Sequence, residues 1–144
     1  MRTEILAVAL AVFALAAAPP PDAVQLHAAG IAWKDAAAPL PAGSKAAVLE
    51  GNPKAAGPFT MRVRVPAGAK IPAHWHPRAE RVTILSGELR LGFGDAIDES
   101  ATTTFRAGDF YINPPQSHHF ILFDKETELQ ITGEGPWELN LLGR

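Results

Sequence analysis

Apolar and polar residues alternate along Phe59–Val65, where arginines at positions 62 and 64 separate the apolar residues. Successive side chains of a strand point to opposite faces, so this pattern predicts a strand with one face in a core. Short apolar runs follow at even spacing, over residues 71–76, 80–86, 88–93, 102–105, 109–113, 118–123, 127–132 and 137–142. Glycine and proline turns separate them, and no long helical period occurs. Many short strands of this kind predict an all-β sandwich or barrel.

The region before this alternating run is rich in alanine and proline. Residues 45–50 are predicted as a strand, residues 24–27 and 31–33 as shorter ones, and residues 35–44 as a loop. Near the other end, Phe120–Phe123 is apolar at every position. A strand of this kind is covered on both faces, which favours burial in a homodimer.

Polar residues with metal-binding chemistry interrupt the pattern after Ile71. His74 and His76 are two positions apart, so on a strand they point to the same face. Glu80 has the same parity and could rejoin that face if residues 77–79 turn the chain back. Two imidazoles and a carboxylate form half of a metal site.

A second run supplies further candidates. Gly108 begins a strand signal, Pro114-Pro115 forms a turn, and His118-His119 leads into the apolar run. Together the two runs resemble the paired motifs of the cupin superfamily. The first is similar to Gly-x5-His-x-His-x3-Glu-x6-Gly at every position, from Gly68 to Gly87. The second is similar to Gly-x5-Pro-x-Gly-x2-His-x3-Asn at Gly108, Pro114 and His119.

The resemblance implies a double-stranded β-helix, the jelly-roll barrel, in a single cupin domain. It also implies that His74, His76, Glu80 and His119 bind one divalent transition metal. Imidazole and carboxylate ligands suit Fe, Mn, Ni, Co or Zn and do not choose among them. The motif spacing selects His119, and strand alternation turns His118 to the other face, although a bulge could exchange the two.

Two positions depart from the second motif. Gln116 replaces a glycine, so we expect a turn that avoids a positive φ, with Pro115 presetting another geometry. Phe123 replaces an asparagine, which makes the predicted pocket more apolar. From strand parity and residue type, we predict a substrate pocket that contains Met61, Val63, Ile84, Tyr111, Ile121, Phe123 and Gln130. Gln116, Gln130 and Tyr111 are also candidate hydrogen-bond partners for the histidines.

Composition narrows the possible functions. The chain has 144 residues, of which 47% are hydrophobic and 19% charged, as expected of one folded domain. The net charge is −2 and no basic run occurs, which argues against a nucleic-acid partner. The sequence contains no cysteine, so disulfides, cysteine-ligated zinc and thiol catalysis are excluded.

The first residues predict export. Arg2 precedes an apolar stretch at positions 5–15, and three alanines follow at positions 16–18. This is the pattern of a signal peptide, and the stretch is too short for a membrane span. We therefore predict a leader over residues 1–18, an N-terminal linker with peripheral strands over residues 19–58, and a cupin barrel over residues 59–142. The mature protein is expected in the periplasm or outside the cell, with no stable membrane insertion.

The fold does not fix the chemistry. Our first hypothesis is a small exported metalloenzyme, a dioxygenase-like oxidoreductase acting on a small organic substrate. The alternative is a binding or sensing module that captures a small molecule at its metal without turnover. Oxygen consumption would separate the two, because only the enzyme requires it.

Overall fold

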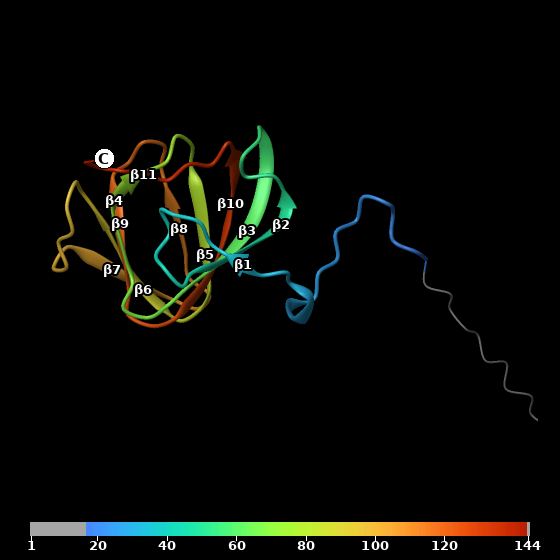
Figure 1. Cartoon of the computed structure of the whole chain (residues 1–144), viewed down its shortest axis with the longest axis horizontal. Helices are drawn as coiled ribbons and strands as arrows, with labels where there is room; N and C mark the ends of the chain where they lie inside the picture. Colours follow the sequence, from blue (N-terminus) through green and yellow to red (C-terminus); the bar gives the residue numbers. More distant parts are fainter. Residues whose placement is uncertain (1–16, 144) are drawn as a thin grey trace, which may run out of the picture.

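The computed structural model describes residues 17–143. It contains two antiparallel sheets that face each other, with the N-terminal residues running away from them (Figure 1). The all-β prediction and the jelly-roll architecture are confirmed. Residues 1–16, which hold nearly all of the predicted leader, lie outside the described residues. Within residues 17–143, no helix is long and apolar enough to cross a membrane.

The larger sheet has six strands. In spatial order they are β1 (Lys34–Asp35), β2 (Lys45–Gly51), β3 (Gly57–Val65), β10 (Thr127–Gly135), β5 (Glu80–Ser86) and β8 (Phe110–Asn113). The smaller sheet has five strands, in the order β11 (Asn140–Leu141), β4 (Lys70–Trp75), β9 (His119–Phe123), β6 (Glu88–Phe93) and β7 (Thr102–Arg106). Strands distant in sequence are therefore neighbours, which brings the two motif regions together.

The core lies between the sheets. The alternation along β3 is confirmed, because Phe59, Met61, Val63 and Val65 are all buried. They pack with inward residues of the opposite sheet and of β5 and β10, including Ile71, Val82, Ile84, Leu89, Leu91, Ile121, Leu129 and Ile131. Each such side chain contributes roughly 1.5–3 kcal/mol when fully buried, so this core supplies the main stabilisation of the barrel.

Two short strands expected near the N-terminus do not form. Residues 24–27 and 31–33 contain no strand, and the described structure instead has a 3-10 turn at Ala28–Gly30 (η1) and the two-residue strand β1. In β1, Lys34 pairs with Ala46 and Asp35 with Lys45 of β2. A short apolar run forms a strand only where a neighbouring strand can pair with it through backbone hydrogen bonds. The sequence pattern does not show whether such a neighbour is present.

Strand β9 is buried at all five positions within a single chain. It is the central strand of the smaller sheet, between β4 and β6. On its outer face, the ring of Phe120 lies against Gly92, where a Cβ atom would clash with it. Lys70 and Arg90 lie opposite Leu122, and both form ion pairs with Glu99. Both faces of β9 are thus covered within one chain. The burial of β9 therefore gives no support to a homodimer, which stays a prediction.

The turn at Gln116 keeps a left-handed backbone although it lacks glycine. Gln116 has φ +61°, so the expectation of a turn without a positive φ was wrong. Its backbone N–H donates to the carbonyl oxygen of His76 at 2.8 Å, and Ser117 N–H donates to Pro114 at 3.3 Å. These two hydrogen bonds hold the residue in a conformation that a side chain disfavours.

We expect the Gln116→Gly variant to be more stable by about 1 kcal/mol, because glycine adopts positive φ without the steric cost of a Cβ atom. Urea denaturation would measure the change. Gln116→Ala is the matched control, since it removes the same side chain but keeps the Cβ atom. Equal stability of the two variants would show that the backbone at this turn is unstrained.

Candidate metal centre

The pairing of β4 with β9 places His74 directly opposite His119. The register shifts between Ile71 and His74, and this β-bulge lets both residues face the barrel interior although three positions separate them. The two imidazole centroids are 4.1 Å apart, and both side chains are buried. The register of one strand pair therefore brings a histidine of each motif together.

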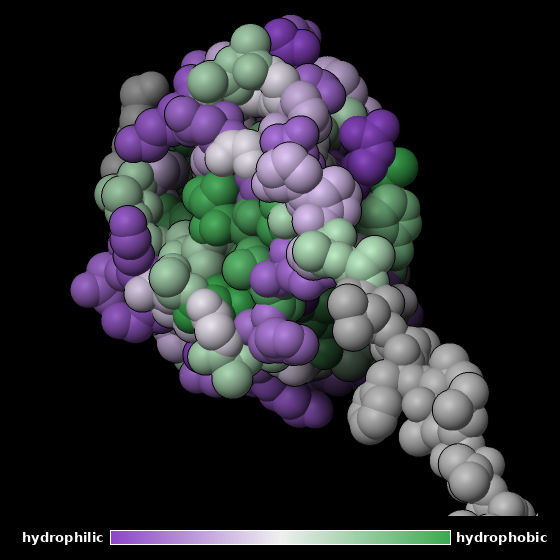
Figure 2. All heavy atoms as spheres, turned by 90° about the vertical axis from the view of Figure 1, so that its right-hand side faces the viewer, coloured by the Kyte–Doolittle hydropathy of each residue, from purple (hydrophilic) through white to green (hydrophobic). Residues whose placement is uncertain are grey.

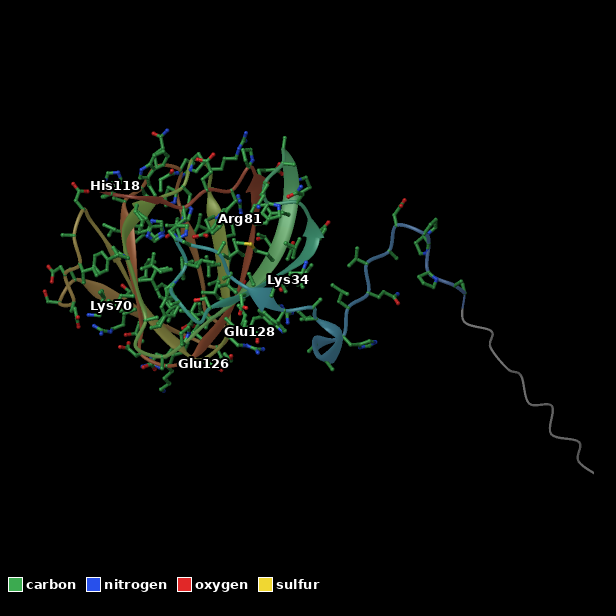
Figure 3. All side chains as sticks on the ribbon, in the orientation of Figure 1. Lys34, Lys70, Arg81, His118, Glu126 and Glu128 are labelled. Atoms are coloured by element: carbon green, nitrogen blue, oxygen red, sulfur yellow. The ribbon has the colours of Figure 1, made fainter. Side chains whose placement is uncertain are left out.

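His76 follows the last residue of β4 and completes a cluster of three imidazoles. Its ring lies 5.1 Å from that of His74 and 5.2 Å from that of His119. The candidate ligand atoms of the three residues all lie within 4.8 Å of one another. His118 is not part of the cluster: it lies on the outside of the barrel (Figure 3), where its Nδ1 is 2.6 Å from Asp95 Oδ1.

Each histidine of the cluster is oriented by a backbone carbonyl. The Nδ1 atoms of His74 and His119 lie 2.8 and 2.9 Å from the carbonyl oxygens two residues earlier, at Pro72 and Ser117. His76 Nδ1 lies 2.6 Å from the carbonyl oxygen of Glu138. Carbonyls only accept, so each Nδ1 carries the proton and donates, and each neutral ring has its lone pair on Nε2. Histidines that bind metals are held in this way.

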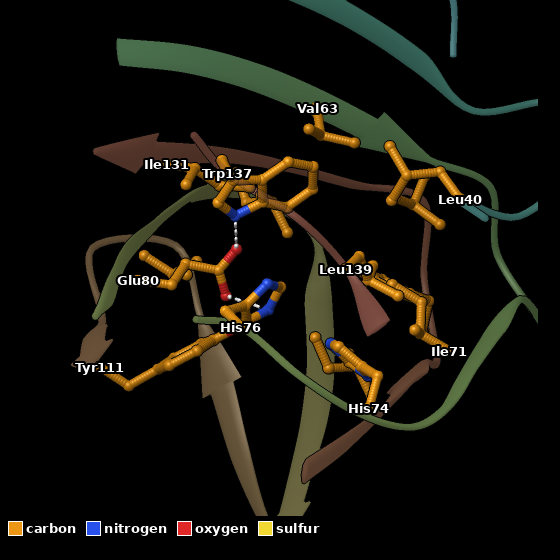
Figure 4. Close-up of a pocket in the computed structure, with 15 residues that line it drawn as sticks. Leu40, Val63, Ile71, His74, His76, Glu80, Tyr111, Ile131, Trp137 and Leu139 are labelled. Carbon is orange, nitrogen blue, oxygen red and sulfur yellow. Dashed lines mark hydrogen bonds and ion pairs between the residues drawn. The ribbon is translucent and has the colours of Figure 1, made fainter. Parts of the chain in front are cut away.

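Glu80 lies beside the cluster at the start of β5. One carboxylate oxygen accepts a hydrogen bond from Trp137 Nε1 at 3.0 Å, and the other accepts from Asn113 Nδ2 at 2.9 Å. The second oxygen also lies 3.3 Å from His76 Nε2 (Figure 4). Asn113 Nδ2 contacts His119 Nε2 as well, at 3.0 Å. Glu80 is thus held beside the cluster, although its carboxylate oxygens are not among the ligand atoms that all lie within 4.8 Å of one another.

Burial and charge set the protonation of these groups. Burial, with the nearby His119, lowers the pKa of His74 to about 3, and burial also lowers the pKa of His119. Burial opposes ionisation of Glu80, but its contacts with His76 and Asn113 prevail and lower its pKa to about 2. Burial likewise opposes protonation of His76, yet the Glu80 carboxylate raises its pKa. At neutral pH the cluster therefore offers the neutral imidazoles of His74 and His119, with His76 paired to the ionised carboxylate of Glu80.

This arrangement suits a cation. Within residues 17–143, Glu80 forms no ion pair with a lysine or arginine, although the residue is only 4% exposed. A buried carboxylate without a full countercharge is costly unless it pairs or coordinates a metal. His76 Nε2 is buried and makes no hydrogen bond in the described part of the chain. Three lone pairs and one negative charge are a donor set that a divalent transition metal would satisfy.

The cluster opens onto an apolar cavity beneath Trp137 and Leu139 (Figure 4). Of the predicted pocket residues, four line it: Val63, Tyr111, Ile121 and Phe123. Ile84 faces inward but is fully covered by the core. Met61 is buried in the core and lines a separate groove next to β2.

Gln130 is not in the cavity, contrary to the prediction. Its neighbours Leu129 and Ile131 face inward, so strand alternation turns Gln130 outward, where it accepts a hydrogen bond from Arg62 Nε at 3.1 Å. The amide side chain of Gln130 suggested a role in the site, but its place in the alternation of β10 puts it on the outward face. None of the three predicted partners, Gln116, Gln130 and Tyr111, orients a histidine, because backbone carbonyls do so instead.

Asn113 is a site residue that the motif comparison did not identify. It is completely buried and lies opposite Glu80 in the β5–β8 pairing. Its parity, equal to that of Tyr111, was a signal available in the sequence. Trp137, which lies outside both motifs, is a second site residue: its indole stacks on His76 at a ring-centroid distance of 5.4 Å and donates to Glu80. No short-range pattern links position 137 to position 80.

Comparison with known proteins agrees with this architecture. Residues 22–138 match the family described as the ChrR cupin-like domain. Germin-like protein 3-1 of Oryza sativa subsp. japonica is 37% identical over 79 residues, which cover 54% of this chain and 35% of that protein. The chain thus spans only about a third of the length of this relative.

Solved structures show the same fold at low identity. The polyketide cyclase RemF from Streptomyces resistomycificus has a TM-score of 0.68 at 14% identity, with 83% of this chain and 85% of that one covered. A candidate acetylacetone dioxygenase from Methylibium petroleiphilum PM1 has a TM-score of 0.63 at 19% identity, with coverage of 80% and 78%. At such identities the likeness describes the fold alone.

The histidine cluster predicts how stability depends on pH when metal is removed. His74 has a pKa of about 3 in the folded protein and an ordinary value of 6.5 when unfolded. Between these values the unfolded chain binds a proton that the folded chain does not, so stability falls on acidification, by about 1.4 kcal/mol per pH unit for this group. His119 acts in the same sense. His76 opposes it, because its raised pKa adds stability that is present below 6.5 and lost at higher pH.

We therefore expect chelator-treated protein to lose stability between pH 6.5 and about 3, with a shallower loss in His74→Gln. Urea unfolding at several pH values in this window would measure both slopes. His118→Gln is the control, since it keeps all three imidazoles of the cluster and should keep the full slope. An unchanged slope in His74→Gln would show that His74 becomes protonated without cost.

Proposed function

The chain belongs to the cupins of the ChrR cupin-like domain family, and on that premise we propose that it is a metal-dependent dioxygenase-like oxidoreductase that acts on a small organic substrate. The observation that carries the proposal is the convergence of three buried imidazoles beside the ionised, buried carboxylate of Glu80. A bound divalent cation would accept the imidazole lone pairs and compensate the buried carboxylate.

In this proposal His74, His76 and His119 hold the metal, and Glu80 either completes the ligand set or balances its charge. A bound divalent metal, Fe, Mn, Ni, Co or Zn, would supply Lewis-acid chemistry and, where redox-active, electron transfer. Backbone carbonyls keep the three imidazoles in the required tautomer. The chain thus provides an oriented donor set before any cation arrives.

The remaining side chains of the cavity exclude water and offer one hydrogen-bond donor. The walls are aliphatic and aromatic, from residues such as Val63, Ile121 and Phe123. The Tyr111 hydroxyl is buried and has no hydrogen-bond partner within the described residues. Burial and the nearby Glu80 raise its pKa well above 10, so it stays protonated. It can therefore donate to an oxygen atom of a small molecule in this cavity.

A binding module without turnover is the second candidate. Apart from Tyr111 and the candidate ligands, no titratable side chain lines the cavity in the described structure, so a dedicated proton shuttle has no obvious carrier. Oxygen uptake by the iron-loaded protein with small oxygen-donor organic compounds, acetylacetone among them, would favour the enzyme. Retained ligand and thermal stabilisation without oxygen uptake would favour the binding module.

We further propose that the protein is exported and acts as a homodimer in the periplasm or outside the cell. Export is supported by Arg2, the apolar stretch at positions 5–15 and the alanines before the proline run. The exposed Phe110 and Ile112 on the edge strand β8 offer an apolar surface for a second copy.

The first test is elemental analysis of protein purified without chelator or added metal. We expect near-stoichiometric iron, manganese, nickel or cobalt, and its loss in His119→Ala, because that variant removes one of three convergent donors. His118→Ala is the matched control, since the neighbouring histidine points outward and its loss should leave metal content unchanged. A circular dichroism spectrum would show that each variant is folded.

Three outcomes would change the proposal. Zinc in place of a redox-active metal would favour the binding module over the oxidoreductase. Equal metal loss in both variants would assign the metal to another site. Absence of metal from the unmodified protein would contradict a metal-dependent function.

Trp137 should control metal affinity through Glu80. We expect Trp137→Phe to weaken metal binding by about 10- to 100-fold, because the ring that stacks on His76 remains while the hydrogen bond to Glu80 is lost. Competition with a chromophoric chelator would measure the affinity. Trp75→Phe is the control, as this tryptophan lies outside the cavity lining. Unchanged affinity in Trp137→Phe would mean that the orientation of Glu80 does not matter to the metal.

A further inference from the structure

A second, larger hollow lies outside the barrel next to the metal cavity. It has a volume of about 580 Å³ and is bounded by the N-terminal residues 32–40, by part of β2 and by residues 137–139. Its walls are mainly aliphatic, with several alanines, Val48 and Met61. On the face turned to the viewer in Figure 2, hydrophobic side chains gather in a hollow bordered by hydrophilic ones. We call this hollow the outer groove.

The outer groove and the metal cavity share a wall. Leu40, Trp137 and Leu139 line both spaces, and Figure 4 shows them above the histidines. The metal cavity leaves only about 20 Å³ for the centre of a water molecule, which is room for about one water. The metal cavity therefore has room for little more than the coordinating atoms of an organic molecule, whereas the outer groove can hold its body.

The rim of the outer groove offers positive charge. Lys34 and Lys54 lie on it, and neither forms an ion pair within residues 17–143. Of the two acidic residues on the rim, Asp35 is neutralised by Lys45, and the Glu138 carboxylate faces the amide of Asn140 at 3.5 Å. An apolar floor with two available ammonium groups suits a ligand with an apolar body and an anionic group.

We infer that the outer groove binds a small apolar organic anion, with its body against Val48, Met61 and the alanines and its anionic group near Lys34 and Lys54. Resting on the proposed function, we also assign this site as the entrance through which such a molecule reaches the metal across the wall of Leu40, Trp137 and Leu139. The ligand class follows from the groove itself and does not depend on the metal.

The shared wall also connects the groove to the metal ligands. Trp137 donates to Glu80, and the carbonyl of Glu138 accepts from His76 Nδ1 at 2.6 Å. A ligand packed against residues 137–139 therefore touches the groups that orient two candidate metal ligands. Trp137 is an internal reporter for the groove, since its indole lines both spaces.

The test is a fluorescence titration of the chelator-treated full chain with 8-anilinonaphthalene-1-sulfonate, an apolar aromatic anion. In a Trp33→Phe, Trp75→Phe background, Trp137 is the sole tryptophan, because the chain contains three. We expect saturable binding at one site with energy transfer from Trp137. Lys34→Glu and Lys54→Glu should each weaken binding several-fold, because each reverses a charge on the rim. Lys125→Glu makes the same charge change away from the groove and should have an effect below twofold.

Each outcome bears on the inference. Absence of saturable binding, or binding without energy transfer from Trp137, would overturn it, since the probe would then sit elsewhere or nowhere. Equal weakening by Lys125→Glu would also overturn it, because only overall charge would matter. If the probe binds in the groove but the purified protein holds no metal, the groove remains a binding site and its role as an entrance to the metal is contradicted. With cobalt-loaded protein, a change in the visible spectrum on adding the probe would support that role, and an unchanged spectrum would contradict it.

Discussion

The register between β4 and β9 is the constraint on which the site depends. It places His74 opposite His119, and the bulge after Ile71 turns His74 into the barrel without moving the apolar residues before it. His76 then lies at the end of β4, where the turn at Gln116 donates a hydrogen bond to its carbonyl. A slip of one residue would send these imidazoles to the opposite face. The strained backbone at Gln116 is a local cost that supports this alignment.

Electrostatics explains why the cluster suits a cation. Burial keeps His74 and His119 neutral, while hydrogen bonds from Asn113 and Trp137 and the neighbouring His76 keep Glu80 ionised. Neutral lone pairs and one negative charge then share a space from which the aliphatic walls exclude water. The interior of the barrel therefore holds a set of donor atoms that a divalent cation would satisfy, and the surrounding hydrogen bonds keep these donors in place.

The segment at residues 137–139 links this chemistry to the outside. The Trp137 indole donates to Glu80, and the backbone carbonyl of Glu138 orients His76. The side chains of Trp137 and Leu139 line both the metal cavity and the outer groove and so lie between them. The N-terminal residues 32–40 form the opposite wall of that groove. They lie outside both motifs, so the motifs do not describe the walls of the outer groove.

The sequence by itself determined the all-β architecture, most strand positions and the histidines that cluster, because alternation and spacing are local properties of a strand. The spacing of the second motif favoured His119 over His118, and the structure decided between them by placing His119 in the cluster and His118 outside it. Tertiary structure alone decided the partners of Glu80 and the position of the outer groove beside the metal cavity, whereas the outward position of Gln130 follows from strand parity, a local property. Trp137 is 57 residues from Glu80, and Asn113 is 33 residues away. Contacts over such separations are set by sheet order and register, which no local pattern encodes.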